Sequence, residues 1–447
     1  MTMLDLGDYV DDRPREGIFR VHRDVYSDPD LFELELKYIF ERSWCFLGLD
    51  VEIEQPGDYV TRWIARTPIL LTRASDGEVR AFINVCPHKG AQLAVAHKGC
   101  TKYHVCPYHG WAFDAAGQCV DVKDKAAGAY PSAFDREDHN LIALPRLASY
   151  RGLIFGSLSA DVPSLEAYLG DMRTFIDLAM DQAPDGMEIV PGRIAYTYRA
   201  NWKLQMDNAM DQYHLTSTHA SYMGVMEKRS RGQGNVGAQQ FDWKKRLEQE
   251  CGAFNFANGH AMIWLNQAEP QKRPIYPRIG EIEAVHGAVR AQWMLKARNS
   301  LIFPNMQIAD ATTLNVRTFR PIAVDKTEMR VHCIAPKGES PEVRRWRLRQ
   351  FEDFFMPTGF ASPDDTVCFE SLQTGYNAHG LDYLQGYYRG IETVVSGADG
   401  AARELAIEPQ FSVRGGFDLN METSMHAPYR QWRRLMCAGM NGEKVWS

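Results

Sequence analysis

Four side chains in the first third of the sequence could together hold an iron–sulfur cluster. They are Cys86, His88, Cys106 and His109, which form Cys-x-His and Cys-x-x-His halves separated by seventeen residues. In a Rieske [2Fe–2S] centre, two Cys hold one iron and two His hold the other. A Cys2His2 zinc site uses the same donors, but zinc fingers pair Cys with Cys and His with His at short spacing. Because each half here carries one Cys and one His, the pattern favours a Rieske centre over zinc.

The residues that flank these donors suit a loop that wraps a cluster. Pro87 and Pro107 directly follow the two Cys, so each loop lacks one backbone N–H and has a fixed φ there. Gly90 and Gly110 allow the backbone to approach a cluster closely. Trp111 could shield the cluster from water or could simply pack in the core, and the sequence leaves both interpretations open.

A second group of possible metal ligands follows in the middle of the chain. It consists of Asp211, His214 and His219, with the pair Asp364 and Asp365 far downstream. Non-haem Fe(II) oxygenases use two His and one carboxylate and leave other positions open for O2. Two His five residues apart lie about 140° apart on an ideal helix, so they reach one metal only if the helix bends or ends between them. Alone, such a pair is more often one surface and one core His. The interpretation as an iron site gains weight because the same chain carries a possible electron-delivering cluster.

These motifs together resemble a known family, the α subunits of Rieske non-haem iron ring-hydroxylating oxygenases. The resemblance rests on Cys-x-His…Cys-x-x-His-Gly-Trp and Asn-Trp-Lys…Asp-x-Tyr-His-x4-His in this order. It extends from about Gly17 to the C-terminal region and is strongest to the large subunits of benzoate, toluate and anthranilate dioxygenases. The segments that carry that similarity are 28–40, 149–157, 320–327 and 350–355.

The resemblance implies a role for each motif residue. The four Cys and His donors of the first motif correspond to the cluster ligands. His214 and His219 correspond to the iron imidazoles. The third iron ligand is the second Asp of an acidic pair that follows a Gly-aromatic turn, which indicates Asp365, with Asp364 as the fallback. Asp211 resembles the catalytic acid that joins an iron His to a Rieske His of the neighbouring subunit, so electrons are expected to cross between subunits there.

The activity implied by the resemblance is that of a terminal oxygenase. It adds both atoms of O2 to an aromatic ring, here of a benzoate-like carboxylate, and gives a cis-dihydrodiol. Ring monohydroxylation, as in salicylate hydroxylases, and oxidative demethylation are alternatives within enzymes. An electron carrier with a binding module is the non-enzymatic alternative, although a carrier would not need both His and the Asp of the second motif.

A buried substrate carboxylate would need a cation or several hydrogen-bond donors. Arg298, with Asn299 beside it, is the first candidate and Arg317 the second, while a surface ion pair would account for either Arg equally well. Further residues expected to line the substrate pocket are Asn208, Met210, Leu215, Phe303 and Phe360.

The expected partners follow from what the sequence contains and lacks. No Gly-x-Gly-x-x-Gly fingerprint and no P-loop occur, so NAD(P)H should deliver electrons only through a separate reductase, directly or by way of a ferredoxin. The two cofactors expected in the chain itself are the Rieske [2Fe–2S] cluster and a mononuclear Fe(II). The resemblance further implies a homotrimer or, with a small β subunit, an α3β3 assembly.

Composition excludes several other classes of protein. The net charge of −7 argues against nucleic acid as a partner. No apolar run approaches the ~20 residues that a membrane span requires. The acidic N-terminus resembles neither a signal peptide nor a transit peptide, and the remaining Cys are scattered, so we expect free thiols in a reducing cytoplasm.

The pattern along the chain predicts an α+β protein with three parts. Residues 1–40 are expected to form an N-terminal helical segment that packs on the catalytic domain, with a helix over 29–40. Residues 41–157 should form a small all-β Rieske domain. Residues 158–447 should form a helix-grip catalytic domain with a mostly antiparallel sheet.

Several elements can be placed more closely. Strands over 61–73 and 79–85 flank a strong turn signal at 75–78. Helical spacing of apolar residues predicts a helix over 165–179, and another is expected over 341–356. The polar, Gly-rich segment 227–240 is either a lid over the pocket or an inert surface loop.

Overall fold

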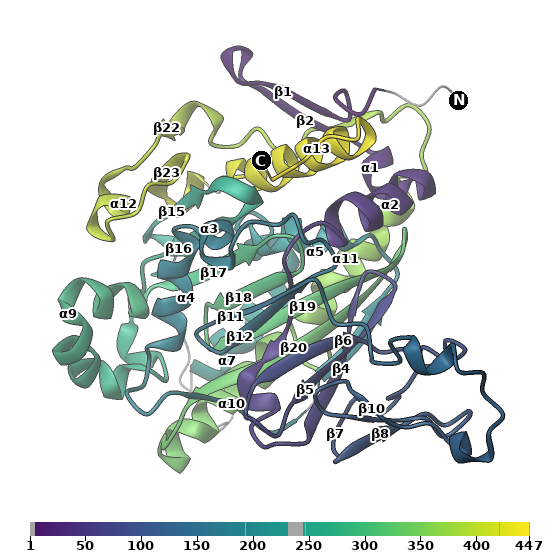
Figure 1. Ribbon diagram of the computed structural model, residues 1–447. Coiled ribbons are helices and arrows are strands. Elements are labelled where there is room, and N and C mark those ends of the chain that lie inside the picture. Colours follow the sequence, from purple (N-terminus) through teal and green to yellow (C-terminus); the bar gives the residue numbers. More distant parts are fainter. Residues whose placement is uncertain (1–4, 193, 231–244, 246, 420, 447) are drawn as a thin grey trace. The chain divides into compact units, whose positions relative to one another are not determined.

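The computed structural model describes residues 5–446 except 193, 231–244, 246 and 420 (Figure 1). The chain divides into two compact units, one formed by Phe40–Leu165 and one by Met1–Ile39 together with Glu166–Ser447. The segment expected to be a lid, 227–240, lies mostly outside the described residues.

The smaller unit contains three antiparallel sheets, which confirms the expected small all-β domain. The first sheet has the spatial order β6 (Val79–Ile83), β5 (Thr67–Arg73), β4 (Asp58–Ile64) and β7 (Lys98–Cys100). The second has the order β10 (Cys119–Asp121), β9 (Ala112–Asp114) and β8 (Tyr103–Val105). The third has the order β11 (Arg146–Tyr150), β12 (Leu153–Ser157) and β3 (Cys45–Leu49).

The hairpin predicted around 75–78 is confirmed, because β5 and β6 pair antiparallel with Arg73 opposite Val79. The single strand predicted over 61–73 is wrong. The chain turns back between Ile64 and Thr67, which are cross-strand partners of β4 and β5. Ala65 adopts a φ of 49° at this turn. The two residues at the turn, Ala65 and Arg66, include no Gly, Asn, Asp or Pro, so the sequence contains no turn signal there.

The larger unit is built on one long antiparallel sheet, as expected for the catalytic domain. Its spatial order is β13 (Met187–Ile189), β20 (Lys326–Pro336), β19 (Leu314–Ala323), β18 (Met306–Asp310), β17 (Ala297–Ile302), β16 (Ala261–Leu265), β15 (Glu250–Asn255), β23 (Phe411–Gly416) and β22 (Val395–Ser396). A further strand, β14 (Ile194–Tyr198), also pairs with β20. The chain reverses between β17 and β18 at the cis Phe303–Pro304 bond.

Helices pack against this sheet, and the residues at the ends of some of them form the second metal site described below. The helix α5 contacts β17 and β19, and α10 contacts β20. The helix predicted over 341–356 is confirmed as α10, whereas the one predicted over 165–179 is interrupted at Gly170 and forms α3 and α4. The helices of this unit are α1 (Asp24–Ser27), α2 (Pro29–Glu35), α3 (Leu165–Leu169), α4 (Met172–Met180), α5 (Trp202–Ala209), α6 (Leu215–Thr218), α7 (Ala220–Ser230), α9 (Ile279–Leu295), α10 (Pro341–Phe355), α11 (Ser362–Gly375), α12 (Gly400–Glu404) and α13 (His426–Met440).

A buried polar cluster ties the N-terminal segment to α5. This segment adds the hairpin of β1 (Val10–Arg13) and β2 (Ile18–His22) before its helices. The carboxylate of Glu35 is fully buried and binds Lys203 Nζ at 2.6 Å. The indole N–H groups of Trp202 and Trp432 donate to the same carboxylate at 2.8 and 2.6 Å. A buried ion pair with all its oxygens used is costly to disrupt from one side. The N-terminal segment therefore fixes the start of the helix that leads into the second metal motif.

Candidate metal centres

The two loops that carry the predicted cluster ligands share one backbone geometry. The carbonyl of Cys86 accepts from the N–H of Gly90 at 2.9 Å, and the carbonyl of Cys106 accepts from Gly110 at 3.0 Å. In both loops the Cys N–H donates to the residue after the glycine, at 2.8 and 2.7 Å. The two glycines have φ values of +77° and +75°, a region that other residues adopt only with strain. The sequence therefore encodes two matching turns.

The four predicted cluster ligands converge at these turns. The thiols of Cys86 and Cys106 are only 1% and 2% exposed. Burial raises the pKa of the Cys86 thiol, and the adjacent Cys106 thiol adds to the shift. The rings of His88 and His109 lie 4.4 Å apart between centroids, and His88 Nδ1 is buried without a hydrogen-bond partner. The thiols of Cys86 and Cys106 thus lie together, as do the imidazoles of His88 and His109. One imidazole nitrogen, His88 Nδ1, has no hydrogen-bond partner.

This arrangement fits a binuclear cluster better than a single zinc ion. Zinc bonds of about 2.3 Å to sulfur and 2.0 Å to nitrogen bring all tetrahedral ligand atoms within about 4 Å of one another. Among the described residues, only one group of three or more His, Cys, Asp or Glu brings its ligand atoms within 4.8 Å, and that group lies in the larger unit. The Cys pair and the His pair are therefore too far apart for one ion, as expected when each pair holds a separate iron.

Trp111 combines the two roles between which the sequence could not decide. Its ring stacks on His88 with centroids 4.9 Å apart and an interplanar angle of 11°. It is only 3% exposed and also contacts Phe134 and His139 edge-on. The indole is therefore part of the domain core and at the same time covers one face of a predicted ligand.

The second motif forms a compact site in the larger unit. His214 directly precedes the single-turn helix α6, and His219 directly follows it. The helix thus ends between them, as two His five residues apart require if they are to face one point. Asp365 lies in the first turn of α11, which contacts α6.

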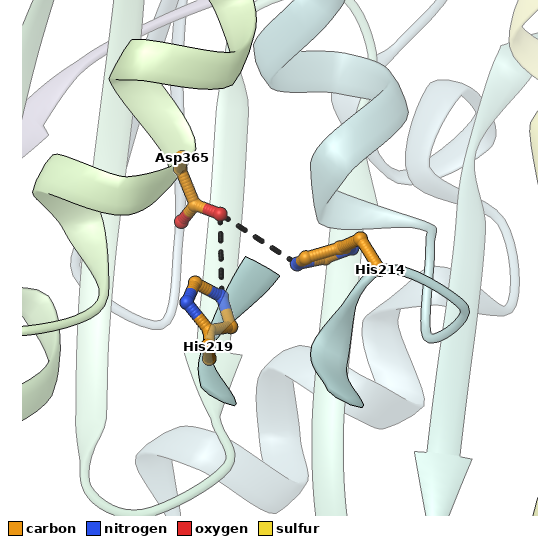
Figure 2. Close-up of side chains that lie close together, drawn as sticks. All are labelled: His214, His219 and Asp365. Carbon is orange, nitrogen blue, oxygen red and sulfur yellow. Dashed lines mark ion pairs between the residues drawn. The ribbon is translucent and has the colours of Figure 1, made fainter. Parts of the chain in front are cut away.

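The three side chains present their polar atoms to one point (Figure 2). His219 Nε2 lies 3.2 Å from Asp365 Oδ1, and His214 Nε2 lies 3.6 Å from the same oxygen. Two imidazoles and one carboxylate on one face are the donor set typical of non-haem Fe(II), and this geometry leaves other coordination positions open. Burial would raise the pKa of Asp365, but His219, His214 and Arg317 together hold it below its usual range, so the carboxylate is charged and ready to bind a cation.

The neighbouring acid Asp364 has a different position. Its Oδ2 accepts a hydrogen bond from Ser221 Oγ at 3.2 Å and lies 3.7 Å from His219 Nδ1, the ring nitrogen that faces away from Asp365. Asp364 therefore lies behind His219, beyond hydrogen-bond distance of the ring, whereas Asp365 faces both imidazoles.

Two further residues hold the site in shape. Asp211 Oδ2 accepts from His214 Nδ1 at 3.0 Å, and its Oδ1 accepts from the backbone N–H of Tyr213 at 2.6 Å. The ring of His214 is thereby fixed with Nε2 toward Asp365, as a carboxylate partner does for many metal-binding His. Asn208 Nδ2 donates to Asp365 Oδ1 at 3.1 Å and so fixes the carboxylate as well.

A cavity opens beside these side chains. Of the residues predicted to line a substrate pocket, Asn208, Leu215 and Arg298 do so, as does the second Arg candidate, Arg317. Lining residues that the sequence did not suggest are Gln212, Ile263, Leu265, Gln307, Phe354, Phe355 and Phe417. Phe354 and Phe355 precede the acidic pair closely and could have been suspected, whereas Ile263, Leu265 and Phe417 reach the cavity only through strand pairing and long-range packing.

The structure does not place the other three predicted residues on this cavity. Met210 is fully buried, and its carbonyl accepts from Ser424 Oγ at 2.5 Å. Phe303 is buried where its carbonyl accepts from Tyr168 Oη at 2.6 Å. Phe360 packs under the guanidinium of Arg229 at 5.6 Å. All three were predicted because they are close to the motifs in sequence, but each side chain packs against other residues and does not line the cavity.

Arg298 lines the cavity, yet its donors are used within the protein. Its Nη2 binds Asp310 Oδ2 at 2.5 Å, and its Nη1 donates to the carbonyl of Trp293 at 2.8 Å. Asp310 also pairs with Arg273, so one buried carboxylate joins two Arg. This network holds β17 and β18 together, because Arg298 and Asp310 are cross-strand partners.

Family models match both units. The model for the Rieske [2Fe–2S] domain matches residues 43–148. The model described as ring hydroxylating alpha subunit (catalytic domain) matches residues 189–438, which is more than half of the chain. The chain belongs to the family of ring-hydroxylating oxygenase α subunits. It is accordingly an oxidoreductase with a Rieske [2Fe–2S] cluster and a non-haem iron, and it receives electrons from a separate reductase.

Similar proteins cover almost the whole chain. The α subunit of toluate 1,2-dioxygenase from Pseudomonas putida is 36% identical over 452 residues, which cover 99% of this chain and 98% of that protein. The large subunit of anthranilate 1,2-dioxygenase from Acinetobacter baylyi is 36% identical, with 97% and 92% covered. The large subunit of 2-halobenzoate 1,2-dioxygenase from Burkholderia cepacia is also 36% identical, with 97% and 93% covered.

Solved structures of this family have the same fold. Naphthalene 1,2-dioxygenase from Rhodococcus, bound to indole, superposes with a TM-score of 0.79 at 25% identity and covers 94% of each chain. A quaternary ammonium Rieske monooxygenase superposes with a TM-score of 0.65 at 18% identity, covering 92% of this chain and 94% of that one, which shows the shared fold alone. Within the described ranges, every helix of this α subunit is too short or too polar to span a lipid bilayer.

Proposed function

We propose that this α subunit adds both atoms of O2 to the ring of an aromatic carboxylate and releases a cis-dihydrodiol. The observation that carries the proposal is the group His214, His219 and Asp365, which faces a cavity walled partly by Phe, Ile and Leu side chains. The three relatives named above act on toluate, 2-halobenzoate and anthranilate, and each of these substrates is a benzene ring with a carboxylate.

The metal ligands follow from the same geometry. We assign the cluster to Cys86, Cys106, His88 and His109, and the mononuclear iron to the two His and the Asp of the second site. When bound, the cluster supplies single electrons and the iron activates O2. The unpartnered Nδ1 of His88 and the shared focus of the second site fit these assignments.

The protein's own side chains then position the reaction. Asp211 keeps His214 oriented and Asn208 keeps Asp365 oriented, through the hydrogen bonds described above. Leu215, Ile263 and Phe354 offer apolar contacts to a ring placed beside the site. A ring held against such walls excludes water from the reacting carbons, which protects the oxidising step from side reactions.

The position of Asp211 also supports an oligomer. Its side chain is 23% exposed, and the adjacent Tyr213 is 48% exposed, so the carboxylate remains accessible although it binds His214. In the family that the sequence resembles, the corresponding acid meets a cluster His of the neighbouring subunit. We therefore propose a homotrimer or an α3β3 assembly with a small β subunit, which works in the cytoplasm with a reductase that acts directly or through a ferredoxin.

Labelled oxygen tests the proposed activity. Purified protein, its reductase and NADH would be incubated under 18O2 with benzoate and, in a separate reaction, with a methoxybenzoate. The products would be identified by mass spectrometry, with incubations lacking reductase as the control. We expect a cis-dihydrodiol that contains two labelled atoms. A product with one labelled atom, or loss of formaldehyde from a methoxybenzoate without ring oxidation, would contradict dihydroxylation.

A further inference from the structure

We infer that Arg317, rather than Arg298, binds the carboxylate of the substrate; this inference rests on the function proposed above and names its specificity residue. Arg317 lies on β19 and lines the same cavity as the three predicted iron ligands. The residue is only 6% exposed, so its charge is buried near the place where a ring must lie.

Within the described part of the chain, the hydrogen bonds of Arg317 leave both terminal nitrogens of its guanidinium available to a ligand. Its Nε donates to Asn315 Oδ1 at 3.0 Å. Among the described residues, no carboxylate lies within ion-pair distance of it, and neither terminal nitrogen has a hydrogen-bond partner. Neither nitrogen is among the fully buried polar atoms that lack a partner, so both remain accessible. They form the planar pair of donors that matches the two oxygens of a carboxylate.

The rest of the Arg317 side chain is held in place, which fixes the orientation of its two terminal nitrogens. Asn315, which accepts from Arg317 Nε, donates from its own amide to the carbonyls of Ala309 and Thr313, both at 3.2 Å. The guanidinium lies over the ring of Phe355, 4.5 Å from its centroid. An Arg that is already ordered loses little further freedom when a ligand binds, and this favours affinity.

The contrast with Arg298 decides between the two candidates. Both terminal nitrogens of Arg298 already have partners. Nη1 donates to the carbonyl of Trp293, and Nη2 binds the buried carboxylate of Asp310. A substrate could use Arg298 only by displacing Asp310, which would leave a buried charge without its partner at a cost of several kcal/mol. Arg317 has no such competitor among the described residues.

The charges around the cavity also favour an anion at Arg317. The two acids that line the cavity are Asp211, which is bound to His214, and Asp365, which faces both imidazoles and would bind the iron. A buried cation without a counterion is costly, and a substrate carboxylate would supply one. A neutral aromatic compound would not provide a counterion for the buried guanidinium. The site should therefore bind aromatic acids in preference to neutral aromatic compounds.

Selection between a carboxylate and its neutral amide tests the inference without any variant. Calorimetry would measure the affinity of the iron-loaded enzyme for benzoate and benzamide, and for anthranilate and anthranilamide. We expect each acid to bind at least about tenfold more tightly than its amide, because a charged, bidentate hydrogen bond is lost in the amide. If both amides bind as tightly as their acids, the inference is wrong.

Variants of Arg317 locate the selection. In Arg317→Gln we expect the affinity for benzoate to fall about 10- to 100-fold while the affinity for benzamide changes less than about threefold. Arg317→Lys should lose less, because it keeps the charge but not the fork. The matched control is Arg320→Gln, three residues along β19 on its opposite face, where Arg320 pairs with Glu328 at 3.3 Å. It should leave both affinities unchanged.

Two results would overturn the assignment to Arg317. One is an Arg317→Gln enzyme that is folded, keeps its iron and binds benzoate as the wild type does. The other is an equal loss of benzoate and benzamide affinity, which would indicate a general change of the cavity. If Arg317→Gln does not fold, the acid and amide affinities of the wild type and of Arg317→Lys decide instead, with equal acid and amide binding in the wild type as the contradicting result.

Turnover separates this inference from the proposed function. If the wild type binds benzoate in preference to benzamide but oxidises no aromatic ring, the proposed function fails while Arg317 remains the anion site. If Arg317→Gln oxidises toluene at the wild-type rate but has lost its response to benzoate, both the oxygenase activity and the role of Arg317 are supported.

Discussion

The two metal sites of this α subunit are built in opposite ways. The proposed cluster ligands lie on two short turns with matching hydrogen bonds, and each turn is defined by six consecutive residues. The proposed iron ligands come from the two ends of α6 and from α11, about 150 residues apart in sequence, and meet only because the larger unit folds around them. Turn chemistry is local and therefore visible in a sequence, whereas the parts of the second site could be joined only through the resemblance to the family.

The two sites also differ in what surrounds their ligands. At the cluster loops the thiols are buried, while His109 and the neighbouring Tyr108 remain partly exposed. At the iron site His219 is 1% exposed, and a second layer of side chains, Asp211, Asp364 and Asn208, contacts the ligands. We therefore expect the cluster site to depend on its turns and ligands, and the iron site to depend also on its supporting residues.

Loss of a cluster ligand should have the largest effect, because two irons leave together. Cys86→Ser should abolish the optical and EPR signals of the reduced cluster and all turnover, while the single iron of the other site stays bound. Cys100→Ser is the matched control, because Cys100 is exposed and belongs to no predicted site. A Cys86→Ser protein with an undiminished cluster signal would remove Cys86 from the ligand set.

Loss of the iron carboxylate should remove one iron and spare the cluster. In Asp365→Ala we expect turnover at background level and a normal cluster EPR signal, because two imidazoles alone bind Fe(II) weakly. Asp364→Ala, at the neighbouring acid behind His219, should keep its iron and lose at most about 10- to 100-fold in activity. The reverse ranking in metal analysis would show that Asp364 is the ligand.

Loss of the charge on Asp211 should leave both metal sites filled and still slow the enzyme. Asp211→Asn keeps the size of the side chain, but its amide cannot accept from imidazole N–H groups on both sides. We expect turnover to fall about 100-fold with unchanged metal content, since outer-layer partners of metal ligands have effects of this order. Reoxidation of a pre-reduced cluster at the wild-type rate, in the presence of substrate and O2, would show that Asp211 is not the link.

The smallest effect should come from the turn glycines. Gly90→Ala places a Cβ in open space but at a φ of +77°, so the cost is strain of about 1–2 kcal/mol rather than a clash. Gly280→Ala, also in open space but at the start of α9, should be neutral or slightly stabilising. Thermal unfolding of both variants measures the difference, and equal stabilities would mean that the turn does not impose this φ.

This contrast also explains how much the sequence could predict. The cluster motif, the α+β class and α10 follow from local patterns. The two His of the second motif gained weight only beside the cluster motif, and Asp365 was indicated by the resemblance to the family. The choice between Arg298 and Arg317 did not follow from a local pattern, because the partner that occupies Arg298 is Asp310 on the adjacent strand. The cavity wall at Ile263 and Phe417 likewise depends on strands that meet only in the folded unit. Residues near a motif in sequence, such as Phe303, were overrated because proximity along the chain does not fix where a side chain points.

Metal analysis of the purified protein is the most direct test of whether one chain holds two separate metal sites. We predict three irons per chain, two in the cluster and one at His214, His219 and Asp365, together with two acid-labile sulfides. Mild treatment with a chelator should remove about one iron and abolish turnover while the EPR signal of the reduced cluster persists, and added Fe(II) should restore activity. Two irons in a protein that gains no activity from added Fe(II), or a zinc ion with no sulfide, would contradict the account.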